Sequence, residues 1–219
     1  LIIENITGEK YETYIKKYIL DTVGMDATYF CNSSTKNRNI ATPYITYNKN
    51  KCVRGTFLNS EFQQAGGIIS NIEDLKKLSI TLINKEAPNM VINNSTFEKM
   101  CRPRKILKYN TSNHKTYSGL GLFINKNFYG DDLVFHNGGI MGGRANISLI
   151  PNKGVGAVVL SNCDNVSAEE VSKMLLSNYI YKNRVQNNVE LKALFNIIVG
   201  KYSSYNNNTS VCIRMVNKK

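Results

Sequence analysis

The residues with the clearest chemical potential are His136, Asn137, Gly138 and Gly139, which stand together at the end of an apolar strand. An acyl-transfer site needs N–H donors aimed at a developing oxyanion, and the main chain of an exposed edge strand supplies them. Glycine lets a substrate backbone approach because it has no Cβ, and histidine donates to a carboxylate or relays protons near neutral pH. The alternative is a histidine that caps a strand at a glycine turn and binds nothing.

The strands that must position these residues follow from Tyr117 onward, where the hydrophobic pattern takes the period of β-structure. Strands are predicted over the segments 117–125, 132–136, 144–150 and 154–162. The last two are joined by Pro151-Asn152-Lys153-Gly154, a tight-turn signal, so we expect them to form an antiparallel hairpin.

Helices are predicted before these strands. The first residues read as the end of a helix closed by Gly8, and the segment 9–23 forms a second helix that ends at Gly24. A third helix begins after Ser70, which forms a capping box with Glu73. The apolar face expected for the second helix consists of Tyr11, Ile15, Tyr18, Ile19 and Val23.

Two further helices are predicted later in the chain. A short one covers Ser95–Met100, and the last begins near Ser167 with a capping box to Glu170. Residues 26–64 are polar and rich in turn formers, so we expect loops with short extended pieces there.

Composition argues against several classes of protein. With 219 residues, of which 42% are hydrophobic, the chain reads as one globular domain with a piece of another. No apolar run reaches about 18 residues, so no membrane span is expected. The net charge of +12 is spread without a basic block, which argues against nucleic-acid binding and leaves a solvated basic surface or attraction to anionic substrates. The five scattered cysteines lack CxxC spacing, which argues against a disulfide framework and a zinc site.

Four strings occur in an order that is typical of a known family. They are "GEKYETYIKKYILDTVGMDATYF" (8–30), "AGGIISNIEDLKKL" (65–78), "YSGLGL" (117–122) and "FHNGG" (135–139). In this order the chain resembles, from its start to about Lys182, the serine β-lactamase-like family of class C β-lactamases, D-Ala-D-Ala carboxypeptidases, D-aminopeptidases and esterases. The resemblance implies an α+β fold of the β-lactamase/transpeptidase type, in which an antiparallel sheet with flanking helices joins part of a helical subdomain, incomplete here.

The resemblance also implies roles for individual residues. Active sites of the family combine a Ser-x-x-Lys motif, which supplies the acylated serine and its lysine partner, with a Tyr-x-Asn motif and a Lys-Thr-Gly or His-x-Gly strand. Here the third motif is His136-Asn137-Gly138. The resemblance makes His136 and Gly139 the candidate catalytic residues, because His136 stands where many relatives have lysine and the Gly139 N–H is the second oxyanion donor. It makes Asn137 and Gly138 candidate substrate-binding residues, with no metal and no organic cofactor.

The other two motifs have only chance matches in the chain. Ser-x-x-Lys occurs at Ser33 and at Ser112, both in polar, Asn-rich loops, and Tyr-x-Asn occurs at Tyr181 and Tyr205, after the histidine motif and so in the wrong order. We interpret all four as unrelated to catalysis, and His114 as a surface loop residue. In relatives the Tyr-x-Asn loop lies just before the helix with which this chain opens. We therefore expect the serine, lysine and tyrosine to lie upstream of the first residue.

These points predict a fragment of a serine hydrolase that acts through an acyl-serine intermediate on an amide or ester, such as a D-amino-acid peptide, a β-lactam or a small ester. We expect the chain alone to be inactive. One alternative is a non-catalytic or decayed member of the family that serves as a binding module, and a more distant one is a basic nucleic-acid-binding domain. The expected partner is a small-molecule or peptide substrate.

Three regions are predicted along the chain. Residues 1–183 form the C-terminal part of a β-lactamase-like domain, and 184–200 form a linker with a short helix. Residues 201–219 resemble the opening strand of a lipocalin-like β-barrel domain. That last strand is expected to have no pairing partner within the chain.

Overall fold

The computed structural model describes residues 2–31, 39–48, 51–55, 63–84, 91–107, 115–180, 200–203 and 210–213. The α-helices are α1 (Ile2–Thr7), α2 (Tyr11–Ile15), α3 (Asp21–Val23), α4 (Gln63–Gly66), α5 (Ile72–Ile83), α6 (Asn94–Met100) and α7 (Ala168–Ile180). A π-helical turn, η1 (Lys16–Leu20), joins α2 to α3, and a 3-10 turn, η4 (Pro151–Lys153), precedes the last strand of the main sheet. The strands are β1 (Tyr29–Phe30), β2 (Tyr44–Asn48), β3 (Lys51–Arg54), β4 (Ile68–Ile69), β5 (Lys105–Ile106), β6 (Thr116–Ser118), β7 (Phe123–Phe128), β8 (Asp131–Ile140), β9 (Gly143–Ile150), β10 (Val155–Ser161), β11 (Gly200–Ser203) and β12 (Ser210–Ile213).

The main sheet has six strands in the order β10-β9-β8-β7-β6-β5, so each strand pairs with its neighbour in sequence, and every pairing is antiparallel. The predicted hairpin is confirmed: β9 and β10 pair from Ile150–Val155 to Arg144–Ser161. The turn between them ends at Gly154, whose φ of 63° lies in the left-handed region. The mixed helix-and-sheet architecture confirms the expected α+β fold.

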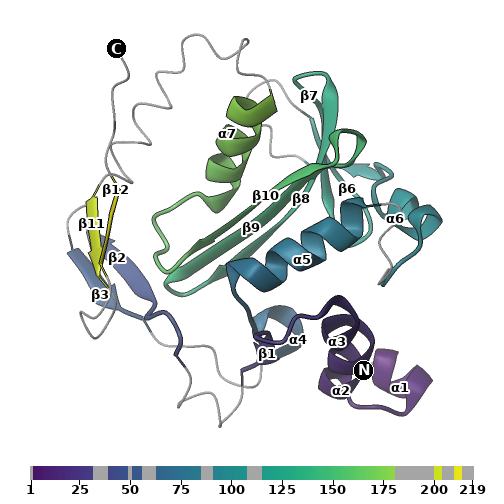
Figure 1. Ribbon diagram of the computed structural model, residues 1–219, viewed down its shortest axis with the longest axis horizontal. Coiled ribbons are helices and arrows are strands. Elements are labelled where there is room, and N and C mark those ends of the chain that lie inside the picture. Colours follow the sequence, from purple (N-terminus) through teal and green to yellow (C-terminus); the bar gives the residue numbers. More distant parts are fainter. Residues whose placement is uncertain are drawn as a thin grey trace.

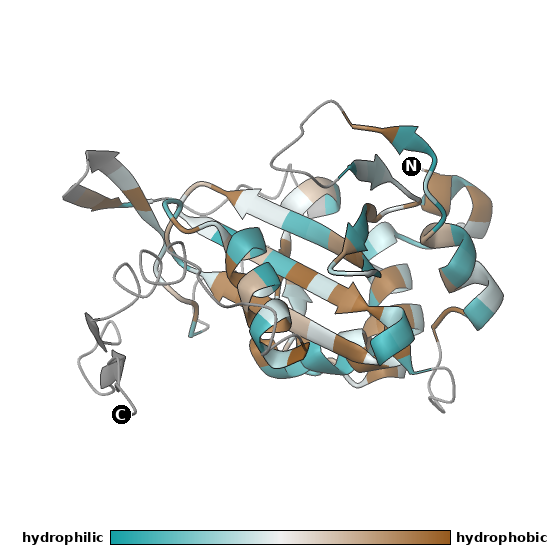
Figure 2. Cartoon of the chain, turned by 90° about the horizontal axis from the view of Figure 1, so that it is seen from above, coloured by the Kyte–Doolittle hydropathy of each residue, from teal (hydrophilic) through white to brown (hydrophobic). Residues whose placement is uncertain are grey.

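Helices cover both faces of this sheet (Figure 1). Successive strand residues point to opposite faces, and β8 shows this directly. Leu133 and Phe135 are buried on the face covered by α7, together with Leu176 of that helix. Val134 is buried on the other face, against Phe97 of α6. In Figure 2, hydrophobic segments (brown) recur along the strands and alternate with hydrophilic ones.

The N-terminal helices pack against the side of α5 that faces away from the sheet (Figure 1). Leu20, Val23 and Phe30 are buried in this third cluster, with Leu75 and Leu78 of α5 against them. The predicted apolar face of the second helix was wrong at one place. Tyr18 is 43% exposed, whereas Leu20 is only 5% exposed. The π-helical turn η1 carries an extra residue per turn, which shifts the buried face by one position.

The predicted capping box at the start of α5 was also wrong by one residue. Asn71, not Ser70, is the N-cap, and its side chain accepts a hydrogen bond from the N–H of Asp74 at 2.9 Å. Ser70 is instead 2.7 Å from the Thr28 hydroxyl. At α7 the Ser167 half of the predicted capping box is confirmed, since the Glu170 N–H donates to Ser167 Oγ at 3.4 Å, whereas the Glu170 carboxylate pairs with Lys173 at 3.2 Å.

Three two-stranded sheets lie outside the main one and pair β1 with β4, β2 with β3, and β11 with β12. The last pairing corrects the expectation that the C-terminal strand has no partner, because Gly200–Ser203 pairs antiparallel with Ser210–Ile213. The chance matches at Ser33, Ser112, Tyr181 and Tyr205 and the loop residue His114 lie outside the described residues.

Candidate active site

The second half of β8, His136–Ile140, is hydrogen-bonded to β9 but not to β7, and we call it the half-open end of β8. β7 pairs with β8 only as far as Phe123–Phe135, whereas β9 continues to pair up to Ile140–Gly143. Among the described residues, His136–Ile140 therefore has a partner strand on one side only. Burial changes at the same point, since 133–135 are buried and 136–139 are exposed. The expected exposed edge exists, but only over the segment that carries the candidate motif.

The side chains of His136 and Asn137 contact different elements. The His136 ring stacks on the ring of Phe123, with centroids 5.4 Å apart and an angle of 15° between the planes. It makes no hydrogen bond to any described residue, so its nitrogens remain available. The Asn137 side chain instead points toward α7, where its Nδ2 donates to Glu169 Oε2 at 2.6 Å. The structure thus gives these two sequence-predicted residues different partners, Phe123 of β7 for His136 and Glu169 of α7 for Asn137.

Gly138 and Gly139 leave the surface of the strand open. A Cβ at Gly138 would lie 3.3 Å from the Ala145 Cβ, which is a tight contact. A Cβ at Gly139 would lie 3.7 Å from Arg144 Nη1, an ordinary van der Waals distance. Packing against the described residues therefore does not require glycine at position 139, and its missing side chain keeps the main chain accessible instead.

Both glycines line a cavity of about 690 Å³ whose remaining walls come from distant segments. Ala65-Gly66-Gly67 and β4 form one wall, and the end of β10 with the β8–β9 turn forms another. The other lining residues are mostly apolar but include the charged Arg144; they are Tyr11, Cys31, Ile40, Ala41, Pro43, Gln64, Ser70, Arg144 and Ala145. Of these walls, sequence analysis singled out the string 65–78, which contains β4, the string 8–30, which contains Tyr11, and the predicted strand 154–162, which contains the end of β10. It did not single out Ile40, Ala41 and Pro43 as parts of a site.

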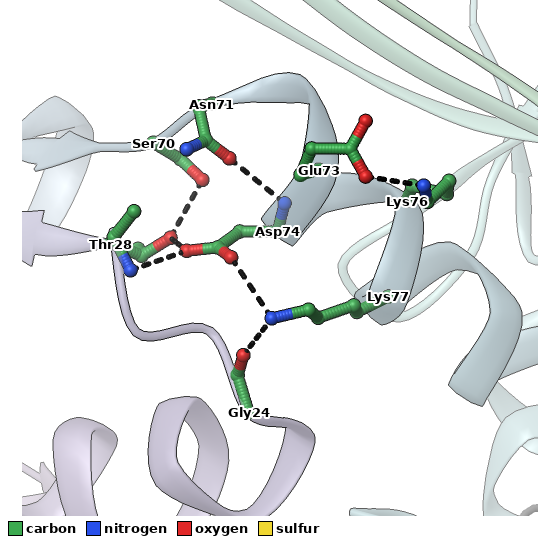
Figure 3. A network of polar contacts seen from close by, with 9 residues as sticks. Gly24, Thr28, Ser70, Asn71, Glu73, Asp74, Lys76 and Lys77 are labelled. Carbon is green, nitrogen blue, oxygen red and sulfur yellow. Dashed lines mark hydrogen bonds and ion pairs between the residues drawn. The ribbon is translucent and has the colours of Figure 1, made fainter.

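The wall at Ser70 is anchored by a buried carboxylate (Figure 3). Asp74, only 2% exposed, accepts hydrogen bonds from the Ala27 N–H at 2.9 Å and from Thr28 Oγ1 at 2.8 Å. Lys77 contacts Asp74 Oδ1 at 3.4 Å and also donates to the Gly24 carbonyl. This network fixes the start of α5, and hence Ser70, against the N-terminal helices.

A second wall is held by main-chain contacts to β2. The Tyr44 N–H donates to the Asn162 carbonyl at 2.8 Å, and the Thr46 N–H donates to Asp164 Oδ1 at 2.8 Å. The hydrogen bond from Thr46 lowers the pKa of Asp164, with a smaller contribution from the positive charge of Arg144. These contacts hold Pro43 at the rim of the large cavity.

A smaller cavity of about 390 Å³ lies beside the first turn of α7. Asn137, Arg144 and Glu169 are among its lining residues, and Gly138 lines both cavities. Arg144 Nη1 donates to the carbonyls of Ile140 and Gly143, each at 2.8 Å, and so closes the β8–β9 turn.

Over the described ranges, the side chains show no group of three or more His, Cys, Asp or Glu that could hold a metal ion. No helix in the same ranges is long and apolar enough to cross a membrane.

The chain is similar to several solved structures. A penicillin-binding protein homologue from Pyrococcus abyssi, described as octameric, superposes with a TM-score of 0.78 at 26% identity, over 98% of this chain and 48% of the homologue. A D-stereospecific amidohydrolase from Streptomyces sp. superposes with a TM-score of 0.63 at 22% identity, over 82% of this chain and 51% of that one. The second likeness shows the fold alone.

Sequence comparison agrees with the structural one. Unguisins hydrolase of Aspergillus campestris is 28% identical over 169 residues, which are 74% of this chain and 30% of that protein. The chain thus spans about a third of this relative and about half of the similar structures. The model of the family described as Beta-lactamase matches residues 1–175. Since that match covers most of the described sheet and helices, this chain belongs to the beta-lactamase family.

Proposed function

We propose that the full-length protein is a serine hydrolase that acts through an acyl-serine intermediate on an amide or ester. The observation that carries this proposal is the half-open end of β8, where Gly138 and Gly139 line a cavity of about 690 Å³ and carry no side chain of their own. Such an edge can present a main-chain N–H to a carbonyl oxygen as it becomes an oxyanion. The family membership of the chain supports the same reaction class.

In the proposed reaction a serine Oγ attacks the substrate carbonyl carbon, and the carbonyl oxygen becomes an oxyanion that accepts a hydrogen bond from the Gly139 N–H. The leaving group departs with a proton, an acyl-serine forms, and water then hydrolyses it. His136 supplies a polar, titratable group at the edge of the strand. Gly138 gives the substrate backbone room to approach.

The proposed substrates are D-amino-acid peptides, β-lactams or small esters. The walls of the large cavity are rich in apolar residues, among them Ile68, Ile140 and Leu160, which suits a substrate with an apolar group next to the scissile bond. The nucleophile is proposed to come from a segment outside these residues, because neither Ser-x-x-Lys match in this chain stands in the family's motif order.

The test is covalent labelling of the full-length protein with a fluorophosphonate probe and with a fluorescent penicillin, followed by peptide mapping. We expect one labelled serine, located upstream of the first residue of this chain, and competition between probe and substrate. Labelling at Ser33 or Ser112 would show that the nucleophile was assigned to the wrong place. Absence of labelling and of turnover would support the non-catalytic binding module.

A further inference from the structure

A chain of hydrogen bonds runs from the interior of the sheet to Asn137. Ser148 Oγ donates to Asn146 Oδ1 at 2.7 Å, and Asn146 Nδ2 donates to Asn137 Oδ1 at 2.7 Å. Asn137 Nδ2 then donates to Glu169 Oε2 at 2.6 Å. Asn146 and Asn137 are direct partners in the β8–β9 register, so the carboxamides face one another across the strands.

The carboxylate of Glu169 sets the direction of every bond in this chain. An ionised carboxylate only accepts, so the amide nitrogen of Asn137 must face it. The oxygen of Asn137 must then face Asn146, whose nitrogen donates to it, and the remaining oxygen of Asn146 accepts from Ser148. One charged residue on α7 thus fixes both carboxamide orientations.

The two inner members of the chain are deeply buried. Asn146 is 1% exposed and Ser148 is 0% exposed. Burial of an amide is unfavourable unless its hydrogen bonds are made, and a fully satisfied network holds its members in one arrangement. The buried carboxamide of Asn146 is therefore stabilised by its hydrogen bonds to Asn137 and Ser148.

We propose that Asn146 and Glu169 are positioning residues that hold the half-open end of β8 in place through Asn137. Within the part of the chain that the structure describes, this segment has β9 on one side only, so a contact from α7 restrains the side on which no described strand pairs with it. Glu169 is itself held by Lys173, which is 2.5 Å from Glu169 Oε1. This positioning of the end of β8 has a consequence for catalysis, which rests on the proposed function. It keeps the Gly139 N–H in the orientation that an oxyanion requires.

The first experiment measures amide hydrogen exchange in the full-length protein and needs no activity. Glu169→Gln removes the charge that directs the chain, and Glu170→Gln is the matched control. Glu170 lies on the same turn and also pairs with Lys173, at 3.2 Å, but no contact joins it to Asn137. We expect exchange of those amides of 136–140 that donate to β9 to rise at least about fivefold in Glu169→Gln and to stay unchanged in Glu170→Gln. Equal exchange in both variants would overturn the proposal.

A double variant that exchanges the amide at position 137 and the carboxylate at position 169 tests whether the hydrogen bond between them can be restored. Asn137→Asp alone places a second carboxylate against Glu169, so exchange at 136–140 should rise. In the double variant Asn137→Asp/Glu169→Gln, the glutamine amide at position 169 can donate to the new carboxylate, and exchange should return toward that of the wild type. Failure of the double variant to recover would contradict the proposal even if either single variant loses stability.

The second experiment measures turnover. We expect Glu169→Gln to lower kcat about tenfold or more while KM changes by no more than about twofold, because misorientation of an oxyanion donor acts on the transition state. Glu170→Gln should change neither. If the wild type shows no turnover and no acyl labelling, the proposed function fails, and the exchange experiment still decides the positioning role. A variant Glu169→Gln with normal kcat and raised exchange would overturn the catalytic part alone.

Discussion

The Asp74 carboxylate accepts a hydrogen bond from the Thr28 hydroxyl at 2.8 Å, across 46 residues of sequence. This bond and the one from the Ala27 N–H join the N-terminal helices to the first turn of α5, beside the wall of the large cavity (Figure 3). The carboxylate is buried, so its partners would be left unsatisfied if it were removed.

We therefore expect Asp74→Ala to lower the free energy of unfolding by about 3 kcal/mol, measured by urea denaturation of the full-length protein. The control is Glu73→Ala, since the Glu73 side chain is 70% exposed and forms only a surface ion pair with Lys76. That substitution should change stability by less than about 0.5 kcal/mol. Equal losses for the two variants would show that the network contributes little.

Gly142 is required by both its conformation and its surroundings. Its φ is 77°, and a Cβ there would lie 2.7 Å from the Tyr44 nitrogen and 2.8 Å from the Pro43 Cβ. Gly154 has a similar φ of 63° but open space around it. We expect Gly154→Ala to cost about 1–2 kcal/mol and Gly142→Ala at least about 1 kcal/mol more, because only the second must also displace backbone. Thermal and urea unfolding of both variants provide the comparison, and equal costs would argue against the close contact with β2.

The substitution His136→Ala distinguishes between two roles for His136, one in catalysis and one as a structural cap of the strand. The ring is exposed and its main contact is the stack on Phe123, so stability should fall by less than about 1 kcal/mol. If the proposed function holds, kcat/KM for a chromogenic amide or ester should fall by about 10² or more. His136→Lys, the residue of many relatives, should retain more turnover than the alanine variant. A loss of stability that accounts for the whole loss of turnover would favour the capping role.

We expect two of the described cysteines, Cys52 and Cys101, to differ in their reactivity with alkylating agents. Burial, with smaller effects from the negative charges of Asp132 and Glu98, raises the pKa of the Cys101 thiol to about 11. The thiolate is the species that reacts with alkylating agents. At pH 8 we therefore expect iodoacetamide to modify the exposed Cys52 long before Cys101 in the folded protein, as measured by mass spectrometry of tryptic peptides.

Unfolding in urea provides the control, because both cysteines should then react at similar rates.

The raised pKa of Cys101 also makes the stability of the protein depend on pH. The unfolded chain releases the Cys101 proton from pH 9 upward, before the folded chain does, so this group's contribution to stability is lost as the pH rises from 9 toward 11. Rapid modification of Cys101 in the folded state at pH 8 would contradict the burial of this thiol.

The parts of this structure that sequence could predict are those set by local chemistry. The turn at Gly154 and the two strands beside it follow from a four-residue signal and strand periodicity, and both are present. Leu20 was missed because the π-helical turn η1 leaves no mark in a pattern read with an α-helical period. Asn71 was missed as the N-cap because the sequence does not show that the Ser70 hydroxyl is hydrogen-bonded to Thr28, a residue 42 positions away.

The residues of the candidate site also fall into two groups, those that the sequence could predict and those that it could not. The glycines and the histidine of β8 were recognisable because they are consecutive and belong to a motif. Their supports, Asn146 and Glu169, carry no motif, and only the strand register and the position of α7 bring them to Asn137.

The order of the strands in the main sheet has a consequence for how the molecule folds. From β5 to β10 each strand pairs with the next in sequence, so the loops that must close to form this sheet are short and the entropy lost in closing them is small. The contacts that enclose the large cavity join residues that are much further apart in sequence, such as Thr46 and Asp164, which are 118 positions apart. We therefore expect the sheet to form early in folding and the cavity to close late, so that a chain can acquire a native sheet while its binding site is still unformed.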